Sequence, residues 1–283
     1  MRLGLAVPVA ILAIGLCACS GRASAPSAAS ATPVSSAATS ANASPAAKVE
    51  LTVFGAASLK GALEKARAAY ETANPGTTLT ISTDSSSALE TQIEQGAPVD
   101  VFLSADTTNP MKLIDAGLAD RPAVAFAGNE LTLIVPTANK GAITTPADLA
   151  RSWLKIIAAG NEVPITKYAM QLVNNLANEA GYPADFVAAY TANIVSREDN
   201  VKAVVAKIEL GEGDAGIVYV TDAKASTKVA RIDVPETANV PATYSGVVIK
   251  ASTNATAAQG FLDWFAGPGG QAILGESGFL PPS

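Results

Sequence analysis

Apolar residues beyond residue 48 alternate between the spacing of β-strands and the spacing of helices. Val49 to Phe54 is a run of strand type, and apolar side chains then recur at helical spacing at Leu59, Ala62, Leu63, Ala66 and Tyr70. Further strands are predicted at Thr77 to Ser82 and Val99 to Leu103, with a helix between them and a short helix from about Asn109 to Asp115. This alternation is typical of a parallel sheet with crossover helices, whose ligands bind at the carboxyl ends of the strands.

A second alternating series begins with a strand at Leu131 to Val135. Pro164 stands where proline favours the first turn of a helix, and a polar segment precedes a helical run that begins at Val201. The pattern predicts further strands at 154–158, 215–220, 229–234 and 244–249, and helices at 261–265 and 271–274. We therefore expect two lobes, with residues 49–129 plus 245–283 in lobe one and residues 130–244 in lobe two.

Two hydroxyl-rich turns follow predicted strands and open predicted helices. One contains Ser58 and the other contains Ser86, and Ser87 with Glu90 fits a capping box for a helix that ends before Gly96. An ordinary helix cap is the commoner explanation for any single serine. Two such turns at neighbouring strand ends, however, present unpaired N–H groups and hydroxyls that together suit an oxyanion.

The N-terminal segment has the pattern of a secretion signal. Arg2 precedes an apolar stretch from Leu3 to Leu16, and a lipoprotein-type sequence follows in which Cys19 is the better candidate for lipidation. We expect a signal peptide at residues 1–18, then lipidated Cys19 and a disordered Ala/Ser/Pro tether over residues 19–48. The alternative is a plain secretory signal, cleaved near Ala18 or Ala23.

Composition argues against several kinds of chemistry. The chain has no histidine, and both cysteines lie in the signal region, so we expect neither a disulfide nor a thiolate metal site in the folded part. A net charge of −6 without a basic patch argues against binding to nucleic acid. A serine nucleophile would lack a histidine base and a Gly-x-Ser-x-Gly turn, which leaves only a Ser–Lys pair with Lys60. We expect a binding protein without a cofactor rather than an enzyme.

An ordered set of short motifs resembles the molybdate-binding proteins of bacterial molybdate ABC transporters, which are class II periplasmic binding proteins. Each motif is weak alone, but the set runs in the same order from Val49 to the end of the chain. The motifs lie at Val53–Leu59, Ser85–Leu89, Gln92–Glu94, Gly96–Asp100, Ser104–Asp106, Val163–Pro164, Glu198–Val201, Gly216–Tyr219, Thr221–Ala223 and Ser277–Phe279.

The resemblance implies an α/β fold of two lobes, each a mainly parallel sheet flanked by helices, joined by two hinge strands. It also implies that a tetrahedral oxyanion is held by the hydroxyls of Ser58 and Ser86, the backbone amides of Ile165 and Val201, and the hydroxyl of Tyr219. Molybdenum would then be bound only as the oxyanion. The first four positions also fall at or beside predicted helix N-termini.

The sequence departs from the family pattern in three places, one of which is the loop Gly160-Asn161-Glu162, which is shorter than usual. Asp84 stands beside the serine triplet where a small neutral residue is usual, and we expect its carboxylate to face away from the anion. Ile165-Thr166 replaces a pair of small residues, which affects the shape of the pocket. Nearby cations should point around the side of the cleft rather than into it; they are Lys60, Lys167, Arg197 and Lys202.

The expected function is that of an extracytoplasmic receptor that binds molybdate and tungstate and delivers them to the membrane permease of an ABC importer. The expected form is a monomer anchored to the membrane by its lipid. A receptor for another tetrahedral oxyanion, such as sulfate or phosphate, is the nearest alternative. A secreted serine-type hydrolase is the alternative from a different class.

Overall fold

The computed structural model describes residues 48–119 and 122–282. The predicted signal peptide, the lipidation of Cys19 and the tether up to residue 47 therefore lie outside the described residues. Among the described residues, no helix is long and apolar enough to cross a membrane.

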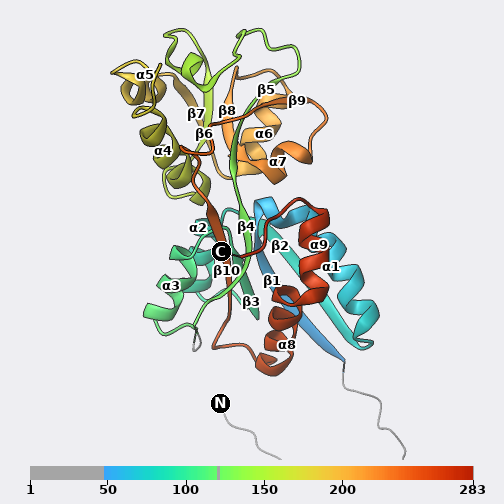
Figure 1. Ribbon diagram of the computed structural model, residues 1–283. Coiled ribbons are helices and arrows are strands. Elements are labelled where there is room, and N and C mark those ends of the chain that lie inside the picture. The colour runs from blue at the N-terminus through green and yellow to red at the C-terminus, as the bar shows by residue number, and fades with distance from the viewer. Residues whose placement is uncertain (1–47, 120–121, 283) are drawn as a thin grey trace, which may run out of the picture. The chain divides into compact units, whose positions relative to one another are not determined.

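Lobe one contains a five-stranded sheet with the strand order β2-β1-β3-β10-β4 (Figure 1). Its strands are β1 (Val49–Ala56), β2 (Thr77–Asp84), β3 (Val101–Ser104), β4 (Val124–Asn129) and β10 (Ala242–Val248). β1 is parallel to β2 and to β3, whereas β10 is antiparallel to both of its neighbours, β3 and β4. Four of the five strands therefore run in the same direction and only β10 is reversed, so this sheet is mainly parallel, as the sequence predicted.

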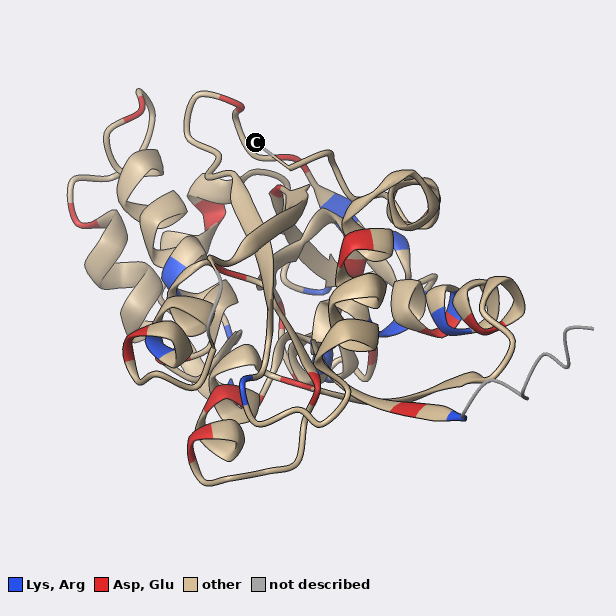
Figure 2. Ribbon diagram, turned by 90° about the horizontal axis from the view of Figure 1, so that it is seen from below, with Lys and Arg blue, Asp and Glu red and all other residues tan. Residues whose placement is uncertain are grey.

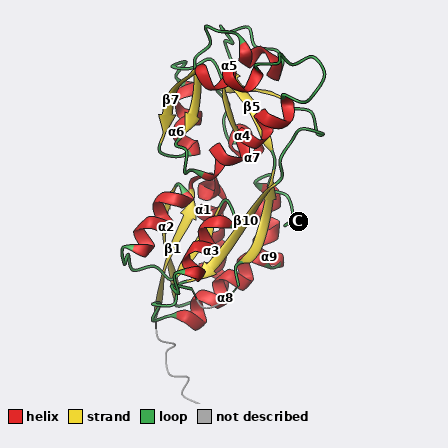
Figure 3. Ribbon diagram, turned by 90° about the vertical axis from the view of Figure 1, so that its left-hand side faces the viewer, coloured by secondary structure: helices red, strands yellow, loops and turns green. Residues whose placement is uncertain are grey.

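Helices cover both faces of this sheet (Figure 3). They are α1 (Lys60–Ala73), α2 (Ser86–Glu94), α3 (Thr108–Asp115), α8 (Ala255–Ala266) and α9 (Pro268–Glu276), and a short 3₁₀ helix, η1 (Ala57–Leu59), precedes α1. Val53 of β1 belongs to the apolar cluster that contains residues of α1 and α8, whereas its neighbour Phe54 belongs to the cluster formed with α2 and α3. Adjacent strand residues point to opposite faces, so one strand supplies both layers of the core.

Lobe two is built from a three-stranded sheet of order β8-β5-β9 and a pair, β6-β7. The strands are β5 (Leu131–Pro136), β6 (Ile156–Ala159), β7 (Ile194–Glu198), β8 (Gly216–Tyr219) and β9 (Val229–Ile232). The helices are η2 (Pro146–Ala150), α4 (Pro164–Leu176), α5 (Phe186–Ala192), α6 (Val201–Glu209) and α7 (Val220–Lys224).

The strand directions in lobe two repeat those of lobe one. β6 and β7 are parallel, a bridge from Ile156 to Ala215 gives β6 the direction of β8, and β5 alone is antiparallel to its neighbours β8 and β9, so four of the five strands run in the same direction. The reason for the reversal of β5 lies in the chain path. Only Glu130 separates β4 from β5, so β5 leaves lobe one and starts at the junction, where Leu131 pairs with Tyr219 at the end of β8. A strand that starts where its neighbour ends must run antiparallel to it.

The start of α2 corrects one expectation. The N-cap is Ser85, whose hydroxyl accepts from the Ala88 N–H at 3.3 Å, so the predicted capping box of Ser87 and Glu90 is wrong. β2 pairs with β1 as far as Asp84, and Ser85 is therefore the first residue free to cap. The Glu90 side chain is buried and lies 3.4 Å from Lys112 Nζ. The predicted end of the helix is confirmed, because Gly96 has a φ of +89° just beyond the C-cap.

Candidate functional site

All five residues that the sequence singled out line one small cavity. Ser58 lies in η1 after β1, Ser86 is the first residue of α2, and Tyr219 is the last residue of β8. Ile165 is the second residue of α4, and Val201 is the first residue of α6. The cavity therefore collects a strand end and several helix starts from both lobes.

The hydroxyl of Ser86 is oriented by a bond to the main chain. Its Oγ accepts from the Ala105 N–H at 3.0 Å, and the side chain is buried. A backbone N–H can only donate, so the serine oxygen uses an acceptor position there and keeps its own proton available. Ser86 is thus prepared to donate to an anion in the cavity.

The hydroxyl of Ser58 has a partner that the sequence did not predict. Ser58 Oγ lies 2.9 Å from the hydroxyl oxygen of Tyr244, which is fully buried in β10. The two residues are 186 positions apart in the chain, so no local pattern could have paired them. The sequence placed Tyr244 only at the start of a strand.

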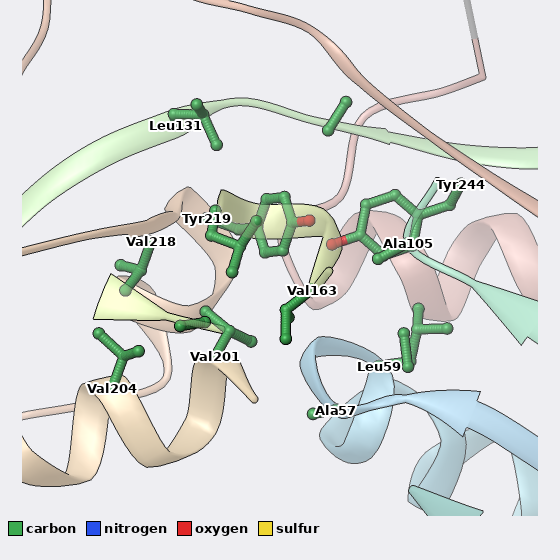
Figure 4. Packing of buried hydrophobic residues seen from close by; sticks show 14 of the residues in the cluster. Ala57, Leu59, Ala105, Leu131, Val163, Val201, Val204, Val218, Tyr219 and Tyr244 are labelled. Carbon is green, nitrogen blue, oxygen red and sulfur yellow. The ribbon is translucent and has the colours of Figure 1, made fainter. Parts of the chain in front are cut away.

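The hydroxyl of Tyr219 is buried and has no hydrogen-bond partner within residues 48–119 and 122–282. Burial raises the pKa of Tyr219 well above the ordinary tyrosine value, and the neighbouring Tyr244 adds to this effect. The group therefore remains a protonated donor. Figure 4 shows the hydroxyl end of the Tyr219 ring directed toward the hydroxyl end of the Tyr244 ring. A buried donor without a partner is costly, which is a physical indication that a ligand completes the site.

Two helix N-termini from lobe two open on the cavity. The first N–H groups of an α-helix lack intrahelical acceptors, and Ile165 in α4 and Val201 in α6 occupy such positions. Asn200 caps α6 by accepting from the Ala203 N–H at 3.1 Å. These termini also carry a partial positive charge, which favours an anion.

The four nearby cations do not line this cavity. Lys202 Nζ lies 2.9 Å from Asp222 Oδ1, and Lys167 Nζ lies 3.7 Å from Glu162 Oε2. Arg197 Nη1 donates to the Ala159 carbonyl at 3.2 Å, and Lys60 is exposed. The cavity is thus surrounded by neutral donors. Figure 2 shows basic and acidic residues interspersed along the ribbon rather than gathered by sign.

Asp84 also stays out of the cavity lining. Its Oδ1 accepts from the Ser85 N–H at 2.7 Å and from Asn200 Nδ2 at 2.9 Å. The Asp84 carboxylate, which would repel an anion if it pointed into the cavity, therefore accepts hydrogen bonds from one donor in each lobe.

Asp222 lies three residues after Tyr219, is fully buried and contacts Lys202. Burial raises the pKa of Asp222, and the Lys202 ammonium partly opposes this rise. Among the described residues, no group of three or more histidine, cysteine, aspartate or glutamate side chains could hold a metal ion. The donor set suits an oxyanion rather than a bare cation.

Two α/β lobes, joined through Glu130 and through residues 233–241, with a cavity of helix N-termini between them, define a two-lobed solute-binding receptor. The chain belongs to the family of bacterial extracellular solute-binding proteins, whose sequence pattern matches residues 51–280.

Known relatives agree with this assignment. The molybdate-binding protein ModA of Mycobacterium tuberculosis is 32% identical over 233 residues, which cover 82% of this chain and 85% of the relative. A Bacillus subtilis protein named an ABC transporter substrate-binding lipoprotein, YvgL, is 30% identical over 234 residues, with 82% and 86% covered. The solved structure of the periplasmic molybdate-binding protein of Azotobacter vinelandii superposes with a TM-score of 0.69 at 25% identity, covering 82% of this chain and 100% of that one. The two-lobed periplasmic-binding-protein fold is confirmed.

Proposed function

We propose that this protein is an extracytoplasmic receptor that binds molybdate, and also tungstate, and delivers it to an ABC importer. One observation carries the proposal: two serine hydroxyls, two helix N-terminal positions and the hydroxyl of Tyr219, which has no partner among the described residues, line a single cavity. The relatives that bind molybdate support the choice of ligand.

The chemistry of the cavity suits a dianion without a proton. Each oxygen of such an anion can only accept hydrogen bonds, and preorganised hydroxyls and amides supply donors without ordering long cationic side chains. In this proposal Ser58, Ser86 and Tyr219 donate through side chains, whereas Ile165 and Val201 donate through the backbone. The protein needs no resident cofactor, because molybdenum arrives as the bound oxyanion and leaves with it.

The proposed role is binding and not catalysis. Family membership supports a receptor. A hydrolase would need a base that activates a serine, yet Ser58 faces Tyr244 and Ser86 faces a backbone amide. Lys60, the remaining candidate base, is exposed.

We also propose that Cys19 carries a lipid and that residues 19–48 tether a monomeric receptor to the membrane, near its permease. The B. subtilis relative named a lipoprotein supports this part. Mass spectrometry of the membrane fraction should find a diacylated N-terminal cysteine at position 19. A mature N-terminus that begins beyond Cys19 would remove the anchor from the proposal and leave the receptor in place.

Calorimetric titration of the purified protein with molybdate, tungstate, sulfate and phosphate tests the ligand. We expect saturable one-to-one binding of molybdate and tungstate, with sulfate and phosphate much weaker. Tight binding of sulfate or phosphate with no response to molybdate would refute the proposal. A scattering measurement with and without molybdate should also show the lobes closing around the anion.

A further inference from the structure

We propose that Asn129 and Tyr244 are positioning residues that fix the proton of the Ser58 hydroxyl so that it points at the bound oxyanion. The three side chains form a buried chain of hydrogen bonds that ends at the cavity. The inference rests on the proposed oxyanion site and adds a reason for its preference for anions without a proton.

The direction of donation along this series of hydrogen bonds is set at Asn129, the last residue of β4. Its Oδ1 accepts from the Glu130 N–H at 3.0 Å, and a backbone N–H can only donate, so the orientation of the amide is determined. Nδ2 must then be the donor to its two other partners. These are Thr221 Oγ1 at 2.8 Å and the Tyr244 hydroxyl at 3.4 Å.

The next step passes through Tyr244. Its oxygen accepts a hydrogen bond from Asn129 Nδ2 and lies 2.9 Å from Ser58 Oγ, a contact in which either hydroxyl can donate. In this proposal Tyr244 donates to Ser58, because Asn129 already occupies one acceptor position of the Tyr244 oxygen. Burial raises the pKa of Tyr244 well above the ordinary value, which keeps the phenol protonated and able to donate. Asn129 and Tyr244 are both buried, so bulk water does not compete for these groups.

The last step is at Ser58. An oxygen that accepts from Tyr244 has its own proton left for the cavity. Ser86 reaches the same state by a separate route, through the Ala105 N–H. Tyr219 contributes a hydroxyl with no partner among the described residues. The three hydroxyls can therefore present protons together, which suits an anion whose oxygens all accept. A proton on the anion would face these donors and would find an acceptor only if one of the hydroxyls turned away.

This arrangement predicts a specific coupling. Tyr244 acts on the anion only through Ser58, so the effect of losing its hydroxyl should depend on the Ser58 hydroxyl. If Tyr244 served packing alone, its loss would matter equally whether or not Ser58 were present. A double-mutant cycle distinguishes the two cases.

The test measures molybdate affinity by calorimetry for the unsubstituted protein, Tyr244→Phe, Ser58→Ala and the double variant. We expect Tyr244→Phe alone to weaken binding by about fivefold, the effect of one hydrogen bond between neutral groups. In the Ser58→Ala background the same change should alter affinity by less than about twofold. Asn129→Ala should show the same dependence on Ser58 with a smaller effect.

Tyr70→Phe is the matched control, because Tyr70 is a buried tyrosine of lobe one that packs on Phe261, away from the cavity lining. It should leave molybdate affinity unchanged. The proposal that Asn129 and Tyr244 orient the Ser58 hydroxyl would be overturned by either of two results. One is an equal loss of molybdate affinity from Tyr244→Phe with and without Ser58→Ala, and the other is no loss in either protein. Absence of molybdate binding by the unsubstituted protein is instead a failure of the proposed function. The cycle is then run with whichever of tungstate, sulfate or phosphate that protein binds.

Discussion

Asn200 Nδ2 donates to Asp84 Oδ1 at 2.9 Å and so joins the N-cap of α6 in lobe two to the end of β2 in lobe one. The two residues are separated by 116 positions in the chain. Asn200 uses its other side-chain atom to cap α6, and Asp84 also holds the Ser85 N–H. This pair therefore ties together the starts of two helices that line the proposed anion site.

The pair predicts an effect of charge on lobe closure. Asn200→Asp keeps an oxygen that can cap α6 but places a second carboxylate against Asp84. Repulsion between the two should disfavour the closed arrangement and weaken molybdate binding by about 1–2 kcal/mol at low salt, and less at high salt because both groups are partly exposed. Titration at two salt concentrations measures the loss. Scattering should show a larger radius of gyration at the same molybdate concentration.

The matched control for this prediction is the exchanged pair. Asp84→Asn combined with Asn200→Asp restores one amide opposite one carboxylate, and it should recover most of the affinity. If the exchanged pair binds as weakly as Asn200→Asp alone, the contact between Asp84 and Asn200 does not control closure.

Tyr219→Phe should separate affinity from stability. The hydroxyl of Tyr219 is buried without a partner in the described part of the chain, so its removal takes away a desolvation cost. We expect the free energy of unfolding of the ligand-free protein to stay the same or rise by up to about 1 kcal/mol. Molybdate binding should weaken by about 1–3 kcal/mol. Thermal unfolding in a scanning calorimeter measures the stability, and calorimetric titration measures the affinity for molybdate. A destabilised variant with normal affinity would contradict the assignment of the Tyr219 hydroxyl as a ligand of the anion.

Ser86→Ala and Val201→Ala should distinguish a side-chain donor from a main-chain donor. Ser86→Ala removes the hydroxyl and leaves the Ala105 N–H without its acceptor, so binding should weaken by about 1–3 kcal/mol. Val201→Ala keeps the backbone N–H and truncates a buried side chain, so its main cost should be to stability. The molybdate affinities of the two variants are compared by calorimetric titration at a temperature well below the melting temperature of each. Equal losses of affinity would show that the two roles are wrongly assigned.

Asp222 should give a recognisable pH dependence of stability. Burial raises its folded-state pKa above the ordinary value of 3.8, so the folded protein favours the protonated form. The protonated carboxyl of Asp222 therefore makes its full contribution to the free energy of unfolding below the pKa of the unfolded state. This contribution is lost as pH rises through the pKa of the folded state. Asp222→Asn should therefore gain stability relative to the unsubstituted protein as pH increases from about 4 toward neutrality. Urea unfolding at several pH values measures this difference, and a constant difference would contradict it.

The neutral-donor account makes a prediction about cations. Lys60→Gln, Lys167→Gln and Arg197→Gln should change molybdate affinity by less than about 0.5 kcal/mol and mainly alter its salt dependence, since none lines the cavity. A loss as large as that of Ser86→Ala at any of the three would indicate a charge-paired site. Lys202 is a separate case, because its replacement also leaves the buried Asp222 without its cation.

Local patterns in the sequence were sufficient to place most elements. Alternation of apolar residues predicted the strand at β1 and the helix at α1, and Pro164 predicted the start of α4. Such features depend on hydrogen bonds and side-chain spacing within a few residues, which the sequence displays directly. The hydroxyl-rich turns indicated Ser58 and Ser86 in the same local way, whereas Ile165, Val201 and Tyr219 were assigned only through the resemblance to molybdate-binding proteins. Their roles as ligands and the exact division of the lobes stay predictions.

The tertiary structure decided which distant groups meet. The contacts of Ser58 with Tyr244 and of Asp84 with Asn200 join positions far apart in the chain, and the antiparallel course of β5 follows from where the chain crosses between lobes. Even the cap of α2 moved to Ser85, because pairing of β2 with β1 extends to Asp84. Sequence patterns specify what a residue can donate or bury. Only the path of the chain through both lobes determines which partner it finds, because that choice depends on every element between the two positions.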